Sequence, residues 1–418
     1  MIRIWTSLLL AFSIIAVNAE EANYDEAKVP PYTLPEVLRF ENGDPISGAE
    51  EWSERRKEIL DLFATHVFGI TPAEAEEARL NSTVDQIIPN FLDGKAVLKE
   101  VSLSIEGKSD GPVFHLLLIT PAGVQSVPTF LGYNFRGNHT IHPDPRIRLS
   151  DSWMRPDKEG RIVNNRSTEV ARGTSANRWP VEKIIDRGFG LAVLYYGDVD
   201  PDFDDGFENG VHAVFGKPER DGWGSIGTWA WGLSRTLDYL ESDPAVDGSK
   251  VAVFGHSRLG KTSLWAGAQD ERFALVISNN SGCGGAALSR RAFGETVKRI
   301  NTSFPHWFND RFPEYNDRLD DLPVDQHQLI ALMAPRPVYV ASAEEDRWAD
   351  PRGEFLSALH GSKAWELFEK TGVGVEEMPG VNEPVGETVG YHIRTGKHDV
   401  TDFDWEQYLD FAERHFAP

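Results

Sequence analysis

Residues 251–261 read VAVFGHSRLGK, and this stretch decides the fold. A short apolar run ends at Gly255, Ser257 follows two residues later, and a second glycine stands at Gly260. The spacing is close to the G-x-S-x-G pattern of a nucleophilic serine at a strand-to-helix turn, with the second glycine displaced by one position. The first amides of the following helix would favour a developing oxyanion beside that serine. An ordinary strand–turn–helix uses the same glycines, so the serine needs partners elsewhere in the chain.

Short apolar runs alternate with helical stretches from about residue 110 onwards. The runs are rich in valine and aromatic residues, as is typical of strands buried on both faces, and they cover 127–135, 190–197, 251–257, 273–282 and 336–346. Residues 224–242 and 402–416 have the apolar periodicity of helices. Strands that alternate with helices predict a mostly parallel sheet between two helical layers, the three-layer αβα sandwich of an α/β-hydrolase.

The segment before this alternation is expected to pack on the core as an extension. Residues 20–48 are rich in Pro, Glu and Asp, and residues 49–67 have helical apolar spacing. Residues 96–107 and 112–123 predict antiparallel strands at an edge of the sheet. We therefore divide the mature chain into two parts, which are an N-terminal extension over 20–100 and a catalytic domain over 101–418.

The first 19 residues have the features of a secretory signal. Arg3 supplies the positive start, residues 8–17 form an apolar run, and a small-x-small cleavage site ends at Ala19. We expect cleavage there and a secreted or periplasmic protein. The chain has a single cysteine, Cys283, which excludes an intramolecular disulfide and is interpreted as a small packed residue.

The formal net charge of −23 argues against two classes of partner. A strongly acidic protein repels phosphate backbones and anionic lipid headgroups, so nucleic acids and membrane surfaces are not expected partners. After the signal, no stretch is long and apolar enough to span a bilayer. The acidic residues are spread along the chain, which indicates solubility, and we expect a monomer.

Ser257 requires a general base, and the base requires an acid that orients it. In α/β-hydrolases the chain order is serine, acid, histidine. The acidic candidates that end or follow the run 336–346 are Glu344, Glu345, Asp346 and Asp350, and the late histidines are His392 and His398. Ser257, Asp346 and His398 fall in the expected order, and His398 lies in a loop just before the C-terminal helix.

Over roughly residues 110–418 the chain resembles the glucuronoyl esterases of the bacterial type, carbohydrate esterase family 15. The motifs that carry the resemblance are GHSRLGK, NNSGCGGAALSRR, EEDRWADPRGE and GKHDVTDFDW. The resemblance implies an α/β-hydrolase and serine esterase. It would cleave esters between 4-O-methyl-glucuronic acid of glucuronoxylan and lignin alcohols, with no cofactor and no metal.

The resemblance also implies roles for particular residues. Ser257 matches the nucleophile, His398 the base, and Arg258 the arginine that binds the oxyanion. A fixed positive charge beside the nucleophile suits a tetrahedral intermediate that becomes negative. The positions matched to contacts with the uronate ring and its hydroxyls are Lys261, Glu295 and Trp348.

The chain departs from the family pattern at Asn280. Many family members have a glutamate at this position, where it serves as the triad acid, but an asparagine holds no charge against an imidazolium. The acid is therefore expected after the later strand, as in many bacterial members. Asp346 is the first choice for that acid, and Glu345 is the second.

Other polar groups give weaker hypotheses. His139 and His142 suggest a metal, but no clear further ligands accompany them. Residues 195–211 pack carboxylates together without the spacing of a calcium loop, and are interpreted as a solvated acidic loop near the cleft. Arg136 or Asn138, in a loop after an early strand, is a candidate contact of the intermediate.

Two alternatives to a glucuronoyl esterase stay open. The first is a carbohydrate acetyl or feruloyl esterase on the same scaffold. The second is a catalytically inactive homologue that binds carbohydrate and leaves every ester intact. The presence of serine, histidine and acid together argues against the second alternative.

Overall fold

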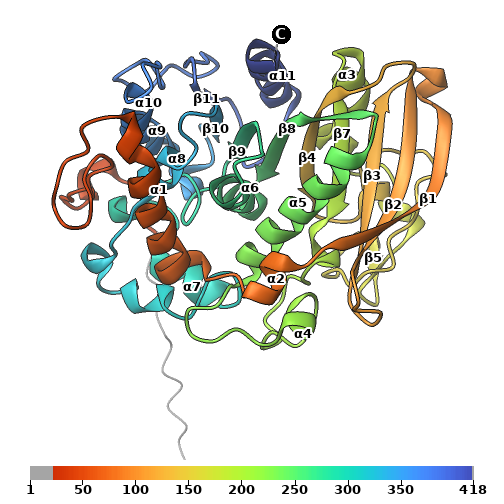
Figure 1. The fold of residues 1–418 in the computed structure, drawn as a ribbon, viewed down its shortest axis with the longest axis horizontal. Coiled ribbons are helices and arrows are strands. Elements are labelled where there is room, and N and C mark those ends of the chain that lie inside the picture. Colours follow the sequence, from red (N-terminus) through yellow and green to blue (C-terminus); the bar gives the residue numbers. More distant parts are fainter. Residues whose placement is uncertain (1–21, 417–418) are drawn as a thin grey trace, which may run out of the picture.

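A computed structural model describes residues 22–416, so the expected signal over 1–19 lies outside the described residues. A sheet of nine strands forms the centre of the molecule, in the order β1-β2-β3-β7-β4-β8-β9-β10-β11 (Figure 1). The strands are β1 (Leu80–Phe91), β2 (Ala96–Ile105), β3 (Val113–Pro121), β4 (Val127–Asn134), β7 (Gly190–Tyr195), β8 (Val246–His256), β9 (Leu275–Asn279), β10 (Val338–Ala343) and β11 (Val389–Arg394). A separate small hairpin pairs β5 (Ile162–Val163) with β6 (Arg166–Ser167).

The helices follow the alternation expected from the sequence. They are α1 (Ala49–Phe63), α2 (Ala73–Glu77), α3 (Val181–Asp186), α4 (His212–Phe215), α5 (Ser225–Ser242), α6 (Arg258–Gln269), α7 (Val297–Ser303), α8 (Gln326–Ala331), α9 (Pro351–Gly361), α10 (Lys363–Glu366) and α11 (Asp402–Phe416). The strands from β7 to β11 in the sheet order are mutually parallel, while β1, β2 and β3 are antiparallel to their neighbours. The expected α/β-hydrolase sandwich with a mostly parallel sheet is confirmed.

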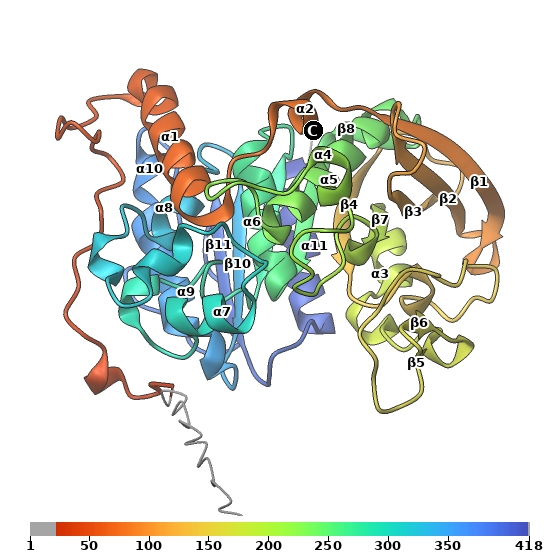
Figure 2. The same cartoon turned by 90° about the horizontal axis from the view of Figure 1, so that it is seen from below.

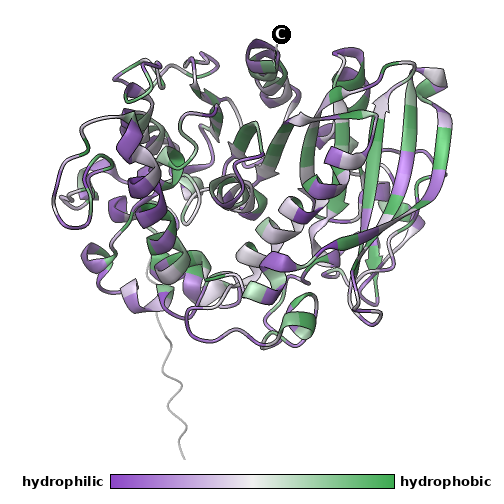
Figure 3. Ribbon diagram, in the orientation of Figure 1, coloured by the Kyte–Doolittle hydropathy of each residue, from purple (hydrophilic) through white to green (hydrophobic). Residues whose placement is uncertain are grey.

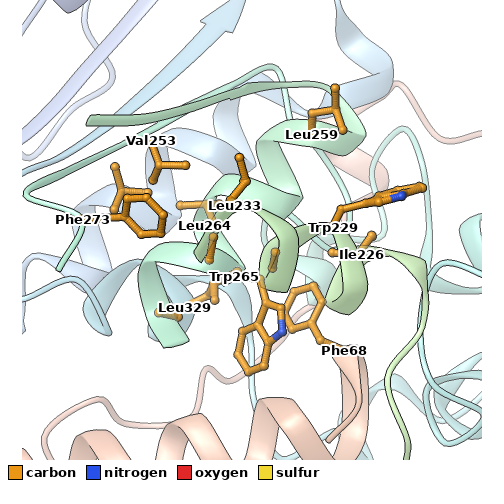
Figure 4. Packing of buried hydrophobic residues seen from close by; sticks show 14 of the residues in the cluster. Phe68, Ile226, Trp229, Leu233, Val253, Leu259, Leu264, Trp265, Phe273 and Leu329 are labelled. Carbon is orange, nitrogen blue, oxygen red and sulfur yellow. The ribbon is translucent and has the colours of Figure 1, made fainter. Parts of the chain in front are cut away.

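Side chains that alternate along the central strands form two separate cores. In β8, Val253 packs with the helices α5 and α6, whereas Phe254 faces α3 and α11 on the other side of the sheet. Figure 3 shows the central strands mainly in the colours of apolar residues. In the larger core the Trp265 ring of α6 stacks on Phe68, with ring centroids 4.6 Å apart (Figure 4). Burial on both faces explains why these strands read as continuous apolar runs.

The antiparallel end of the sheet differs from the sequence-based expectation. β2 and β3 are antiparallel as expected, but β1 forms the edge, and β2 is paired on both sides. The expected boundary between residues 100 and 101 falls inside β2. Residues 80–105 therefore belong to the sheet, because β2 bonds β1 on one side and β3 on the other. The polar pattern of β1, most of which is exposed, explains why the sequence did not reveal it as a strand.

The loops that follow the parallel strands gather at one edge of the sheet. Figure 2 shows the segment with β5 and β6 below β4 and β7, on the same side of the view as α7 and α9. The loop between β11 and α11 ends at this side as well. Ligand sites of open parallel sheets form beyond the carboxyl ends of the strands. Among residues 22–416, none of the helices is both long and apolar enough to cross a membrane.

Candidate active site

Ser257 lies on a sharp turn between β8 and α6. Its backbone has φ 59° and ψ −128°, a conformation that is strained for any residue with a side chain. A Cβ atom on Gly255 would lie 1.8 Å from the carbonyl oxygen of Leu259, so only glycine fits there. The amide of Ser257 donates a hydrogen bond to the carbonyl of Asn279 at 2.9 Å. The turn thus holds the serine at the carboxyl end of β8, as the motif predicts.

His398 is hydrogen-bonded to one of the acidic candidates. Its Nδ1 atom lies 2.6 Å from Oδ2 of Asp346, which is buried, while the imidazole is partly exposed. The amide of Asn280 donates to the same Asp346 oxygen at 3.0 Å. Glu345, the second choice, is exposed. The geometry therefore pairs His398 with Asp346 through Nδ1, while His398 and Ser257 line the same cavity.

Two other histidines near the turn are buried and hydrogen-bonded. His256 is buried, and its Nδ1 lies 2.6 Å from Oδ1 of Asn279. Burial and the neighbouring His398 hold the pKa of His256 well below its ordinary value, so this ring stays neutral. His392 is fully buried between the Tyr339 hydroxyl and Asp404. Neither ring has the exposed position that a general base requires.

Arg258, directly after the serine, is held by the buried carboxylate of Asp202. Oδ2 of Asp202 accepts from the guanidinium and from the Tyr196 hydroxyl. Oδ1 accepts from Nε2 of His306 at 2.9 Å and from the indole of Trp307 at 2.8 Å. Burial alone would raise the pKa of Asp202, but the His306 hydrogen bond and the charge of Arg258 hold it below its ordinary value. The guanidinium also lies 4.9 Å from the centre of the Trp307 ring, so its position is tightly defined.

The acidic loop over 195–211 is only partly solvated, which corrects the sequence-based interpretation, because three of its aspartates are buried. Asp198, Asp200 and Asp202 are each less than a tenth exposed. Asp200 accepts from the Ser225 hydroxyl at 2.6 Å and lies 3.0 Å from Nδ1 of His212. Burial raises the pKa of Asp198 to about 7. The donors come from distant parts of the chain, so the letters of the loop alone could not reveal them.

Three residues behind the other weaker hypotheses, His139, His142 and Asn138, already have hydrogen-bond partners in the protein. His139 is buried, with Nε2 2.6 Å from the Ser167 hydroxyl, and Nδ1 of His142 accepts from the amide of Asp144 at 3.2 Å. No group of three or more His, Cys, Asp or Glu among residues 22–416 is arranged to hold a metal ion. Asn138 is buried, and its side chain donates to the carbonyl of His115 and accepts from the amide of Asn134.

A cavity of about 540 Å³ opens beside Ser257. Ser257, Arg258 and His398 lie on its wall together. The opposite wall comes from the segment between β4 and α3, with Arg136, Trp153, Arg155, Arg161 and Arg178 among its lining residues. The nucleophile candidate therefore faces a space that admits a small organic group.

The three expected sugar contacts form a cluster of their own next to Arg258. Nζ of Lys261 donates to the carbonyl of Ser281, and burial lowers the pKa of the Lys261 ammonium, an effect that the charge of Glu295 opposes. Burial raises the pKa of Glu295, and the positive charge of Lys261 opposes the rise. Trp348 is 37% exposed, and its carbonyl accepts the amide of Glu295 at 2.9 Å. Among the described residues that line the 540 Å³ cavity, none is Lys261, Glu295 or Trp348.

Comparison with known proteins decides the family. The chain is 50% identical over 402 residues to a carbohydrate esterase of an unknown prokaryotic organism, which covers 94% of this chain and 92% of the relative. The chain belongs to carbohydrate esterase family 15. A solved CE15 esterase from a marine bacterial metagenome, described as promiscuous, has a TM-score of 0.89 and 51% identity over 94% of this chain and 100% of its own.

Other relatives and a family model agree with this family. The glucuronoyl esterase from Solibacter usitatus has a TM-score of 0.88 and 48% identity over 94% of this chain and 100% of its own. A 4-O-methyl-glucuronoyl methylesterase of Schizophyllum commune is 26% identical, covering 90% of this chain and 85% of the relative. A family model described as glucuronyl esterase, fungi, matches residues 209–369. That range includes the serine turn and Asp346 but not His398.

The sequence of this CE15 chain did not reveal two residues that hold others in the site, namely Asp202, which contacts Arg258, and Asn280, which contacts Asp346. Asp202 is one of several carboxylates in the acidic loop, and its regular two-residue spacing from Asp200 and Asp198 gave no sign of burial. Asn280 stood out only as a departure from the family pattern, whereas its amide contacts Asp346. No signal in the sequence connects Asp202 with His306 and Trp307, which follow more than 100 residues later.

Proposed function

We propose that the chain is a serine esterase that cleaves esters between 4-O-methyl-glucuronic acid of glucuronoxylan and alcohols of lignin. One observation carries this proposal, namely the pairing of His398 with Asp346 beside the strained Ser257 and the fixed Arg258. Family membership, with relatives named glucuronoyl esterase and 4-O-methyl-glucuronoyl methylesterase, supports the choice of substrate.

In the proposed reaction, Ser257 Oγ attacks the ester carbonyl and Nε2 of His398 takes the hydroxyl proton. Asp346 accepts a hydrogen bond from Nδ1–H of His398, remains ionised and stabilises the imidazolium that forms. The carbonyl oxygen becomes an oxyanion, which the Arg258 guanidinium and the first amides of α6 stabilise. The tetrahedral intermediate collapses to an acyl-enzyme, and His398 returns the proton to the departing alcohol. Water then attacks the acyl group with His398 again as the base, which releases the uronic acid and the free serine.

The uronyl half of the ester is assigned to the cluster of Lys261, Glu295 and Trp348. A charged amine and a carboxylate provide donors and acceptors for the sugar hydroxyls, and the exposed face of the Trp348 indole gives an apolar surface for the ring. The charges of both Arg258 and His398 act on Glu295, so the cluster adjoins the reacting groups. An esterified uronate is neutral, which suits a cluster whose charges balance.

The test is hydrolysis of benzyl glucuronate by the mature chain beside a Ser257→Ala variant, with an aryl acetate as the second substrate. Turnover of the glucuronate ester that disappears in Ser257→Ala supports the proposal. Activity on the acetate alone would favour an acetyl esterase, and a feruloyl ester extends the same comparison. A folded protein that binds glucuronoxylan and hydrolyses none of the three esters would be the inactive homologue.

We also propose that the protein is exported, cleaved after Ala19, and monomeric. The charge and cleavage pattern of residues 1–19 supports export. Expression of the full chain with its own first residues, followed by N-terminal sequencing of the mature protein, tests the cleavage. Sedimentation of the purified protein tests the oligomeric state, and a dimer mass would contradict this part of the proposal.

A further inference from the structure

The cavity beside Ser257 has an excess of positive charge, although the chain as a whole has a net charge of −23. Five arginines and three aspartates lie on its wall, and these are Arg136, Arg155, Arg161, Arg178, Arg258, Asp157, Asp202 and Asp399. Guanidinium groups gathered in a concave, partly desolvated site are a typical binding site for a carboxylate or phosphate.

The three aspartates are engaged by three of the arginines. Arg258 is bound to Asp202, as described above. Arg161 lies 2.7 Å from Asp157, and Arg178 lies 2.6 Å from Asp399. These pairs account for the negative charge of the cavity wall, so the remaining arginines must be considered separately.

Arg136 and Arg155 are the arginines without a close carboxylate of their own. The nearest carboxylate to Arg136 is Asp157 at 3.9 Å, and Arg161 already binds that group. Arg155 donates to the backbone carbonyl of Asp202 at 3.2 Å, and none of the carboxylates among the described residues 22–416 lies within ion-pair distance of it. Burial and the positive charge of Arg161 lower the pKa of Arg136, while Asp157 only partly offsets them. An added anion would relieve this repulsion.

The proposed reaction decides which half of the substrate enters this cavity. The uronyl half is assigned to Lys261, Glu295 and Trp348, which are not part of the cavity lining. Ser257 and Arg258 line the cavity, and the charge of Arg258 also acts on Lys261 and Glu295. With the uronyl half on that cluster, a group that extends from the ester oxygen into the cavity belongs to the alcohol. Phe135 and Trp153, both partly exposed, add aromatic surface to the same wall.

We propose that this cavity binds the alcohol half of the ester and selects aromatic alcohols that carry a carboxylate, through Arg136 and Arg155. The inference rests on the proposed function, since it assigns the alcohol to one side of Ser257. It defines the class of alcohol in the ester, which the contacts with the uronate do not define. The carboxylate would be held by two guanidinium groups while the ring lies against Phe135 and Trp153.

A matched pair of substrates tests this selection. Benzyl glucuronate and 4-carboxybenzyl glucuronate differ only in a carboxylate on the alcohol ring. We expect kcat/KM to be about tenfold higher for the carboxylated ester at low salt, as one good charge-assisted contact provides. The preference should shrink when the salt is raised to about 1 M, because screening then acts over a few ångströms.

Two variants and a control locate the effect. Arg155→Gln and Arg136→Gln should each lower kcat/KM for the carboxylated ester several times more than for the benzyl ester. Arg166→Gln removes the same charge from an exposed position in the same segment, outside the cavity lining, and should keep the wild-type ratio. An equal loss of preference in Arg166→Gln would mean that the overall charge is responsible, which would overturn the inference.

The outcomes separate this inference from the proposed function. Turnover of benzyl glucuronate with no preference for the carboxylated ester overturns the inference and leaves the proposed function intact. Loss of both reactions removes the proposed function, and calorimetry on Ser257→Ala then tests the cavity alone. In that measurement 4-(hydroxymethyl)benzoate should bind more tightly than benzyl alcohol, and Arg155→Gln should remove the difference. If free glucuronate shows the Arg155-dependent binding instead, the cavity takes the acid product and the inference fails.

Discussion

The buried carboxylate of Asp202 binds the guanidinium of Arg258. Its two oxygens also accept hydrogen bonds from Tyr196, His306 and Trp307. All four donors are fixed by packing, so Asp202 acts as a rigid support for the arginine beside the nucleophile. In the proposed reaction, the remaining hydrogen atoms of Arg258 face the place where the ester oxygen becomes negative. On the proposed mechanism, this relationship explains why a buried carboxylate lies so close to the place where an anion would be stabilised.

Replacing Asp202 by asparagine should weaken catalysis more than substrate binding. Loss of one oxyanion donor typically costs about 100- to 1000-fold in kcat. Asp202→Asn keeps Arg258 but loosens its position, so we expect kcat on benzyl glucuronate to fall about 10- to 100-fold with little change in KM. Removal of one partner of a buried ion pair should also lower the free energy of unfolding, by about 3 kcal/mol or more.

Asp204→Asn is the matched control for this experiment. Asp204 lies on the same loop and is exposed, so its variant should keep both kcat and stability. If Asp202→Asn raised KM and left kcat unchanged, Asp202 would contribute to substrate binding and not to the position of Arg258. Thermal unfolding of both variants separates loss of fold from loss of the oxyanion contact.

A comparison of Asp346→Asn with Glu345→Gln tests the choice of triad acid. The carboxylate of Asp346 lies 2.6 Å from Nδ1 of His398, whereas Glu345 is exposed. An asparagine at 346 can donate to Nδ1 and stabilise the wrong tautomer, so kcat should fall about 10⁴-fold. Glu345→Gln should retain nearly all activity. Steady-state rates on benzyl glucuronate measure both, and the opposite ranking would assign the acid to Glu345.

The sequence predicted the layers of the fold, and it indicates the proposed reacting groups for the same physical reason. Strands buried on both faces need continuous apolar runs, and a nucleophile on a tight turn needs glycine at Gly255, so both leave a record in the local sequence. β1 left no such record because most of its residues are exposed. Its place in the sheet depends on pairing with β2, which is a tertiary property.

The support of the site could not be predicted because it depends on contacts between distant segments. Nothing near Asp202 indicates that His306 and Trp307 would enclose it. Asn280 is a second example. An asparagine has no negative charge, but the sequence does not indicate that its amide would contact Asp346. Local patterns thus indicate the groups proposed to react, whereas the residues that position those groups become visible only in the fold.

Asn280→Asp should shift the pH dependence of the reaction. Nδ2 of Asn280 lies 3.0 Å from Oδ2 of Asp346, so an aspartate at 280 would place two carboxylates side by side. Like charges at this distance raise the pKa of the pair, and one carboxyl group then keeps its proton at higher pH. We expect the acidic limb of kcat/KM to move up by about one pH unit or more.

The reference for this shift is Asn280→Ala, which removes the amide and adds no charge. It should lower kcat by a few fold and leave the acidic limb where it is in the wild type. Rates of benzyl glucuronate hydrolysis measured across the acidic pH range give the acidic limb of each variant. An unchanged profile in Asn280→Asp would mean that the new side chain turns away from Asp346.

Glu354 should make the protein less stable as the pH rises towards 8. This fully buried carboxyl on α9 contacts the Ser342 hydroxyl at 2.6 Å and the amide of Gly282 at 2.9 Å. Burial raises its pKa from 4.5 to about 8. Between these values the folded protein holds a proton that the unfolded chain has lost. The free energy of unfolding therefore falls with rising pH, by up to about 1.4 kcal/mol per pH unit from this group.

Glu354→Gln removes this titration and keeps the shape of the side chain. Urea unfolding at several pH values between about 5 and 8 should give a shallower decline in the free energy of unfolding for the variant than for the wild type. Some decline should persist, because Asp198 also has a raised pKa of about 7. Glu377→Gln, at an exposed position, should reproduce the wild-type slope. Equal slopes for Glu354→Gln and the wild type would show that Glu354 is ionised in the folded protein, and that the loop over 279–282 is held by a buried charge instead of a neutral acid.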